Sequence, residues 1–432
     1  MESTRGNNGW KMLAAAAACA MLLAGCGDKN RSEDAVAAAV KEEEAGGNSG
    51  ENSQEEPSEP KKLTLWYTQP DLEEYFLEAA AAYEGETKVE VEAVQVPALD
   101  YIEAINKGSV EDADYPDLYV VTTDQLEKAV LAGLTTEAGK DVCSSDYFSQ
   151  KALDAVTYKG KRVAYPFYSD TSVLIYNKNY VQEAPATIED IQSFSEAFEG
   201  DGMIQNIFVW NVNDIFVDFF TIGNFVNFGD AYGDSLEHIV LNSEEIQECL
   251  SFYQELSQFF AIDRELVSEE QIIQEFAEGK TVYAIIRDDS IEELDALISE
   301  ENPLPYGISA VPDLTGELPV RPLSITHSIA VNGYSECPKE AADFARFLTV
   351  EKAEELYGIC GNFPVRKGVS YDNPDISRVL AQYEEALEVP KVMQMSNYWL
   401  IMESAFSDIW AGADVAACME QAQEMMDAAL GQ

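Results

Sequence analysis

Histidine is almost missing from this chain of 432 residues, which contains only His238 and His327. The two lie far apart in the sequence, so neither a zinc site built on paired histidines nor a Ser–His–Asp triad is indicated. Seven cysteines occur, at positions 19, 26, 143, 249, 337, 360 and 418, and no two of them have CxxC spacing. This spacing excludes a redox motif and a zinc ribbon, and it predicts buried thiols with at most one or two chance bridges. We expect neither a metal nor a cofactor.

Basic residues are also scarce. The chain has 27 Lys and Arg against 79 Asp and Glu, a formal net charge of −52. Such a surface repels nucleic acid and anionic lipid headgroups, which excludes both as partners, whereas neutral or cationic solutes fit the field better. Apolar residues are abundant at 46%, and a chain of this length predicts two lobes rather than one compact core.

The N-terminus has the form of an export signal. Arg5 and Lys11 precede an apolar run, Met12–Leu23, that is too short to span a bilayer comfortably. The run leads into Leu-Ala-Gly-Cys ending at Cys26, which resembles the bacterial lipoprotein box, where the cysteine receives a diacylglycerol and the peptide is cut just before it. We predict a lipoprotein signal peptide over 1–25 and acyl chains such as palmitate on Cys26, which anchor the protein on the extracytoplasmic face of the cell membrane.

An acidic tether is predicted next, over residues 26–61. This segment alternates acidic clusters with Gly, Asn, Ser and Pro and contains no aromatic residue, so it cannot bury enough surface to fold. The folded part then opens with alternating strand and helix patterns, expected over Leu63–Tyr67, Leu72–Tyr83, Val89–Val96, Tyr101–Lys107 and Pro116–Val121. This β-α-β-α-β order predicts an α/β layered domain with ligands at the carboxyl ends of the strands.

Several segments carry a resemblance to a known family: 115–121 (YPDLYVV), 159–166 (KGKRVAYP), 172–178 (SVLIYNK), 276–280 (FAEGK), 306–312 (YGISAVP), 363–366 (FPVR) and 389–399 (VPKVMQMSNYW). In order and content they resemble the family 1 extracellular solute-binding proteins of ABC transporters, and within them the maltose/maltodextrin-binding group. The resemblance covers nearly all of residues 62–430.

This resemblance implies an α/β fold of the type 2 periplasmic-binding-protein class, with two α/β lobes joined by a hinge and a ligand cleft between them. Mapped onto this sequence, the N-lobe holds 62–168 plus 326–371, and the C-lobe holds 169–325 plus 372–432. The implied mechanism is closure of the lobes over a solute, followed by delivery to the permease subunits of the transporter. A monomer without enzyme activity is expected.

Carboxylates that accept hydrogen bonds from hydroxyls, and aromatic faces that cover C–H patches, are the groups that hold sugars. Asp124, Asp170 and Asp214 stand where the maltose-binding group has acidic ligand residues, with Phe216 at an aromatic position beside the third. The remaining aromatic candidates are Trp399 as a C-lobe platform, Trp66 and Tyr67 at the end of the first strand, and Tyr168 as a platform or hinge wedge. Trp210, on an apolar strand, is expected in the core.

The sequence also departs from the family pattern. Arg287-Asp-Asp-Ser290 occupies a stretch where the family has a stacking platform, and Val121 replaces another aromatic residue. Glu403 replaces a basic position of the site. Arg287 pairs with Asp288, pairs with a pocket carboxylate, or hydrogen-bonds the solute, and the sequence alone leaves these alternatives open. His327 is interpreted as a structural hinge residue.

The predicted function is capture of a small carbohydrate, from a mono- to an oligosaccharide, for import. A second hypothesis keeps the fold and replaces the sugar by a polyamine or another cationic solute, which the acidic composition would suit. A third, a secreted glycosidase, needs an acid–base pair of carboxylates, and no sequence feature marks out such a pair.

Overall fold

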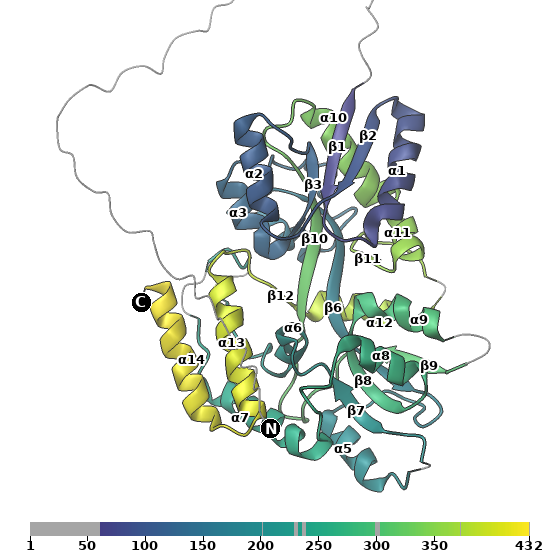
Figure 1. Ribbon diagram of the computed structural model, residues 1–432, viewed down its shortest axis with the longest axis vertical. Coiled ribbons are helices and arrows are strands. Elements are labelled where there is room, and N and C mark those ends of the chain that lie inside the picture. The colour runs from purple at the N-terminus through teal and green to yellow at the C-terminus, as the bar shows by residue number, and fades with distance from the viewer. Residues whose placement is uncertain are drawn as a thin grey trace, which may run out of the picture. The chain divides into compact units, whose positions relative to one another are not determined.

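The computed structural model describes residues 61–200, 202–228, 232–235, 239–298, 303–371 and 373–431. The predicted signal peptide, Cys26 and the acidic tether, apart from residue 61, lie outside these residues. The folded unit, Pro57–Gln432, is a mixed α/β structure (Figure 1). Within the described ranges, no helix combines the length and the apolar character needed to cross a bilayer.

The first half of the unit has the alternating order predicted from the sequence. Its elements are β1 (Lys62–Tyr67), α1 (Leu72–Thr87), β2 (Glu90–Gln95), α2 (Tyr101–Glu111) and β3 (Leu118–Thr122). Strand β1 pairs in parallel with both β2 and β3, as β-α-β connections require. The prediction for this segment is therefore confirmed.

Two long strands connect the halves of the unit, and Figure 1 shows both running between the upper and lower groups of elements. They are β6 (Tyr165–Asn177) and β10 (Leu323–Val331), and they are antiparallel to each other. In the first half of the unit β10 also pairs with β3, and in the second half β6 also pairs with β8 and β9. Side chains in the middle of β6 and β10 therefore lie where the two halves meet.

The remaining strands are β4 (Thr157–Tyr158), β5 (Lys161–Arg162), β7 (Asn206–Trp210), β8 (Thr281–Arg287), β9 (Tyr306–Ser309), β11 (Phe363–Pro364) and β12 (Leu387–Glu388). The remaining α-helices are α3 (Leu126–Leu131), α4 (Gln150–Ala155), α5 (Ile188–Ala197), α6 (Ile215–Asp218), α7 (Glu244–Phe260), α8 (Glu269–Ala277), α9 (Ile291–Leu297), α10 (Pro338–Arg346), α11 (Ala353–Cys360), α12 (Ile376–Glu385), α13 (Met395–Trp410) and α14 (Val415–Leu430). The last two helices pack against each other.

The buried apolar residues fall into clusters that follow the two halves. Two clusters draw mainly on 63–168 and 329–365, and two others mainly on 173–323 and 376–426. Phe363 and Tyr383 are exceptions, because each packs in a cluster of the other half. The exact lobe boundaries stay a prediction. Trp210 is fully buried, as expected of a core residue.

The cysteines of the described part are unpaired. Cys143, Cys249 and Cys360 are buried, Cys337 and Cys418 are half-buried, and all five are free thiols. Burial raises the pKa of the Cys143 and Cys249 thiols to about 12, so neither is a reactive thiolate at neutral pH.

Candidate functional site

The candidate site forms where β6 and β10 cross between the halves. Tyr168 is paired with His327 across the two strands, and their rings stack with centroids 4.1 Å apart and an interplanar angle of 10°. Asp170 follows two residues after Tyr168, so both side chains lie on the same face of β6. The strand crossing therefore brings an aromatic ring, an imidazole and a carboxylate to one face.

Asp170 and His327 are joined directly. His327 Nε2 lies 2.9 Å from Asp170 Oδ2, and only 7% of Asp170 and 6% of His327 are exposed. The Gln69 amide lies 3.5 Å from His327 Nδ1. Gln69 and Asp170 therefore contact the two ring nitrogens of His327. Burial alone would raise the pKa of Asp170, but the attraction and hydrogen bond of His327 and the charge of Arg287 lower it below its ordinary value.

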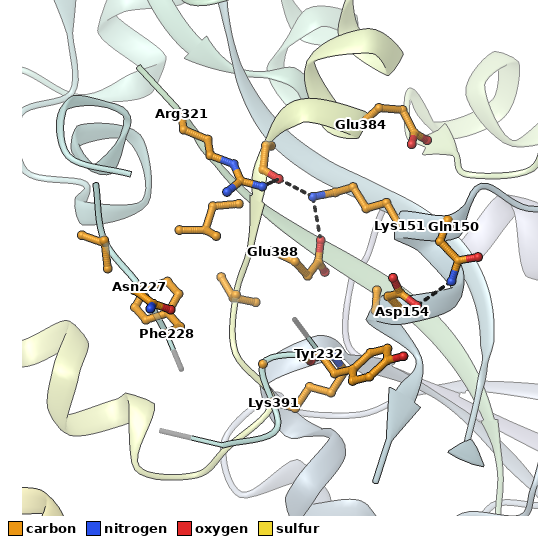
Figure 2. Close-up of a pocket in the computed structure, with 16 residues that line it drawn as sticks. Gln150, Lys151, Asp154, Asn227, Phe228, Tyr232, Arg321, Glu384, Glu388 and Lys391 are labelled. Carbon is orange, nitrogen blue, oxygen red and sulfur yellow. Dashed lines mark hydrogen bonds and ion pairs between the residues drawn. The ribbon is translucent and has the colours of Figure 1, made fainter. Parts of the chain in front are cut away.

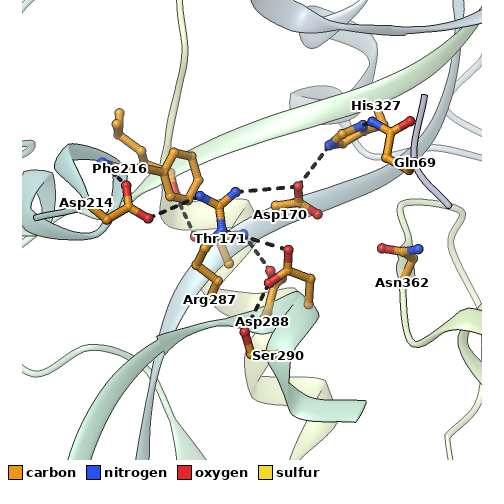
Figure 3. Close-up of polar contacts among 12 residues, drawn as sticks. Gln69, Asp170, Thr171, Asp214, Phe216, Arg287, Asp288, Ser290, His327 and Asn362 are labelled. Carbon is orange, nitrogen blue, oxygen red and sulfur yellow. Dashed lines mark hydrogen bonds and ion pairs between the residues drawn. The ribbon is translucent and has the colours of Figure 1, made fainter. Parts of the chain in front are cut away.

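Arg287 provides the positive charge of the site (Figure 3). It is the last residue of β8, and its guanidinium lies 3.4 Å from Asp214, 3.8 Å from Asp289 and 3.9 Å from Asp170. The same guanidinium lies over the ring of Phe216, 4.4 Å from its centroid. Of the alternatives left open by the sequence, the structure therefore places Arg287 in ion pairs with carboxylates of the site, and not in a pair with Asp288.

The position of Asp214 follows from its local structure. Asp214 is the N-cap of α6, where its Oδ1 accepts a hydrogen bond of 2.9 Å from the backbone N–H of Phe216. Aspartate is favoured at this position because it satisfies a backbone donor that has no partner within the helix. The cap leaves Oδ2 directed at Arg287, and it fixes the carboxylate and the Phe216 ring together.

Asp288 differs from Asp170 and Asp214, because its carboxylate binds a backbone N–H and is not paired with Arg287. It is 1% exposed, and its Oδ1 accepts a hydrogen bond of 2.9 Å from the backbone N–H of Thr171, whereas Oδ2 has no partner among the described residues. Burial, followed by repulsion from Asp170 and Asp289, raises the pKa of Asp288 well above its ordinary value. The hydrogen bond from Thr171 therefore ties the short 3₁₀ turn that follows β8 to β6.

A cavity of about 300 Å³ opens beside this cluster, at the lower end of the range for small-molecule pockets. Its lining is polar and acidic: Gln69, Asp71, Tyr168, Asp170, Asp289, Ser290, Glu292, Glu293, His327, Cys360 and Asn362. Partial burial and the nearby Asp170 raise the pKa of Asp289 to about 6. The cavity therefore offers hydroxyl-binding acceptors, two amides and a negative field.

A larger cavity of about 690 Å³ lies elsewhere, beside α4 and β12 (Figure 2). One of its cations, Lys151, donates to the Ala386 carbonyl at 2.6 Å and lies 3.6 Å from Glu388. Arg321 donates in the same way to the carbonyl of Glu385 at 2.9 Å. These cations bind backbone carbonyls of the connecting segment. We place the candidate site at the smaller cavity, because the predicted residues Tyr168 and Asp170 line it and Arg287 pairs with Asp170.

The structure brings half of the predicted binding residues together: Tyr168, Asp170, Asp214, Phe216 and Arg287. Trp66 and Tyr67 do not join them. Trp66 is 8% exposed in one core cluster, and Tyr67 is 2% exposed in another, where its ring packs 5.0 Å from Phe76. Alternation along β1 turns the two rings to opposite faces, and helices cover both faces.

The other three predicted residues lie outside this cluster. Asp124 is exposed on the short 3₁₀ turn after β3, where it accepts a hydrogen bond of 2.5 Å from the Thr122 hydroxyl. Trp399 is half-buried on α13, and its ring packs at 5.7 Å on Phe219 and 4.9 Å on Tyr398. Glu403, one turn further along α13, is exposed.

Apart from Tyr168 and Asp170, the residues that line the cavity were missed or given another role from the sequence, as three of them illustrate. His327 was interpreted as a hinge residue, although it contacts Asp170 and lines the cavity. Gln69 was read only as part of a turn, and Glu292 was not singled out. The position of Gln69 directly after the first strand was the available signal, because polar residues at strand carboxyl ends line ligand sites in α/β folds. For Glu292 the sequence held no such signal.

Comparison with known proteins gives a consistent picture. The family model described as "Bacterial extracellular solute-binding protein" matches residues 78–382. The maltodextrin-binding protein of Bacillus subtilis (strain 168) is 23% identical over 372 residues, covering 82% of this chain and 87% of the relative. The galactooligosaccharide-binding protein of the same organism is 24% identical over 368 residues, covering 80% of this chain and 84% of that protein.

Solved structures agree in fold. A Staphylococcus aureus extracellular solute-binding protein in complex with maltose has a TM-score of 0.74 at 20% identity, covering 86% of this chain and 98% of that chain. The Listeria monocytogenes maltose-binding protein, also with maltose, has a TM-score of 0.74 at 20% identity, covering 87% and 99%. These similarities confirm the predicted two-lobe α/β fold.

Proposed function

The chain belongs to the bacterial extracellular solute-binding proteins, a family that binds rather than converts its ligands, and we propose that it captures a small carbohydrate for import. The observation that carries this proposal is the convergence of Asp170, on β6, and Asp214, at the start of α6, on the guanidinium of Arg287. Such carboxylates accept strong hydrogen bonds from paired sugar hydroxyls. The relatives named for maltodextrin and galactooligosaccharide binding support the same ligand class.

The strand crossing also supports a mechanism. Ligand contacts from both lobes stabilise the closed state by the difference in affinity between closed and open forms. Gln69 and His327 come from the first-half side of the cavity, and Asp289 and Ser290 from the second-half side. A solute that bonds to both sets would close the hinge at β6 and β10, and the closed form would then dock on the permease subunits of an ABC transporter.

Attachment to the membrane is part of the proposal. Cys26 would carry the lipid, with residues 26–61 as the tether, and the folded unit would work as a monomer on the extracytoplasmic face. A relative from Streptococcus pneumoniae serotype 4 is itself named a solute-binding lipoprotein. Cys26→Ala should move the protein from the membrane fraction to the soluble fraction on ultracentrifugation. Sedimentation with membranes in that variant would contradict the anchor.

A cationic solute, such as a polyamine, is the second candidate. It is favoured by one observation, the five carboxylates that line the cavity: Asp71, Asp170, Asp289, Glu292 and Glu293. Against it, the cluster already contains the cation of Arg287. The glycosidase hypothesis is set aside, because the family consists of binding proteins.

A thermal-shift panel separates the two candidates. Maltose, maltotriose and galactose-containing oligosaccharides are compared with spermidine and putrescine, and glycerol at equal osmolality serves as the non-specific control. A ligand at about 100 times its Kd should add roughly 2.7 kcal/mol to the free energy of unfolding. Stabilisation by a saccharide alone supports sugar capture, whereas stabilisation by the polyamines alone replaces it with the second candidate.

A further inference from the structure

Arg287 is held beside the cavity by the fold itself, next to the cavity residue Asp170. Its backbone N–H donates to Glu269 Oε1 at 2.9 Å, and its side chain is only 28% exposed. Three carboxylates lie within 4 Å of its guanidinium, and the ring of Phe216 covers one of its faces. The cation is therefore a fixed part of the site.

Arg287 already takes up the two kinds of group with which a protein binds an organic cation, namely carboxylates and an aromatic face. An ammonium group binds to carboxylates as a counter-ion, and it binds over the face of an aromatic ring. Here Arg287 neutralises part of the charge of Asp170 and Asp214, and it covers the face of Phe216. An incoming ammonium would meet repulsion from the guanidinium at each of these places.

We propose that Arg287 determines the charge of the solute: it acts as a built-in counter-cation that lets the cleft take an uncharged saccharide and exclude organic cations. The inference rests on the proposed function and narrows its substrate class to uncharged sugars. With their charge balanced, Asp170 and Asp214 remain hydrogen-bond acceptors for hydroxyls. Discrimination of this kind depends on a repulsive element aimed at the competing ligand.

The test is isothermal titration of the full chain with spermidine, putrescine and maltotriose. Arg287→Met removes the charge and keeps an unbranched side chain, whereas Arg287→Lys keeps the charge. Arg378→Met is the matched control, because Arg378 also pairs with an aspartate, Asp375 at 3.7 Å, which is not one of the three aspartates that Arg287 contacts. Circular dichroism melting checks that each variant folds, and Arg287→Gln replaces the Met variant if that variant does not.

Arg287→Met should bind spermidine at least ten-fold more tightly than the unaltered protein, while Arg287→Lys and Arg378→Met should match the unaltered protein. The inference is overturned if the Met variant gains no affinity for spermidine, or if the Lys variant gains as much as the Met variant. Maltotriose keeps the two proposals apart. Failure of the unaltered protein to bind any saccharide contradicts the proposed function, whereas saccharide binding without a polyamine gain in Arg287→Met contradicts only the role of Arg287.

Discussion

The pKa values of two buried aspartates, Asp170 and Asp218, are shifted in opposite directions. Asp170 contacts His327 and Arg287, and its pKa is lowered. Asp218 accepts hydrogen bonds from Trp210 Nε1 at 2.7 Å and from the Tyr253 hydroxyl at 2.9 Å. Burial raises the pKa of Asp218 to about 7, against the effect of those two bonds. A buried aspartate whose hydrogen-bond donors are uncharged, such as Asp218, therefore has a raised pKa. A nearby cation, such as Arg287 beside Asp170, lowers the pKa instead.

The two residues also contribute to stability with opposite signs. The folded pKa of Asp170 lies below the unfolded value, so its contribution is present above about pH 4 and is lost as the pH falls further. The folded pKa of Asp218 lies above the unfolded value, so the folded state binds more protons between about pH 4 and pH 7 and loses stability as the pH rises through that window. At neutral pH the charged carboxylate of Asp170 therefore stabilises the folded state, whereas ionisation of Asp218 in the core destabilises it.

Asp218→Asn should produce the largest effect. Because Asn cannot ionise, the variant should lack a loss of unfolding free energy on the order of 4 kcal/mol that Asp218 causes between pH 4 and pH 8. Urea denaturation of both proteins at pH 4 and pH 8 measures this difference. Burial also raises the pKa of Glu269 to about 7. Because Glu269 is present in both proteins, its contribution cancels when the pH dependence of the variant is subtracted from that of the unaltered protein. Equal pH dependence in both proteins would show that Asp218 is not the buried acid described here.

Asp170→Asn tests whether the charge of the aspartate in the site contributes to saccharide binding. The substitution keeps the shape of the side chain and removes the charge that strengthens its hydrogen bonds, which is worth about 1.5–3 kcal/mol. We expect saccharide affinity to fall by about 10- to 150-fold in isothermal titration. Glu403→Gln serves as the control, since that exposed carboxylate lies outside the cluster and should change affinity little. Equal losses in the two variants would argue for a general effect of charge.

Most of the fold could be predicted from the sequence because its signals are local. The apolar run Leu63–Tyr67 and the helical spacing in Leu72–Tyr83 are set by near neighbours, and the structure contains both elements. The site was only half predictable, because its contacts join distant segments. Asp214 meets Arg287 across 73 positions of sequence, and Asp170 meets His327 across 157. No periodicity reveals such pairs, and the burial of Trp66 and Tyr67 likewise depends on which helices cover β1.

Trp399→Ala should produce the smallest of the effects expected here. The family resemblance predicts this ring as a platform for the sugar, and an aromatic contact contributes about 0.5–1.5 kcal/mol beyond area burial, so in that role its loss should lower saccharide affinity by about two- to twelve-fold. Trp210→Phe extends the comparison of cleft and core, because Trp210 is buried and bonded to Asp218. That variant should lose stability in urea denaturation and keep its saccharide affinity. A Trp399 variant that loses stability alone would place its ring with the core residues.

The most direct measurement is a crystal structure of the full chain with a bound saccharide. The account predicts a sugar whose hydroxyls donate to Asp170 and Asp214 beside a guanidinium that still lies on Phe216. A sugar held in the larger cavity beside Lys151, or a cleft whose aspartates contact no ligand, would contradict it.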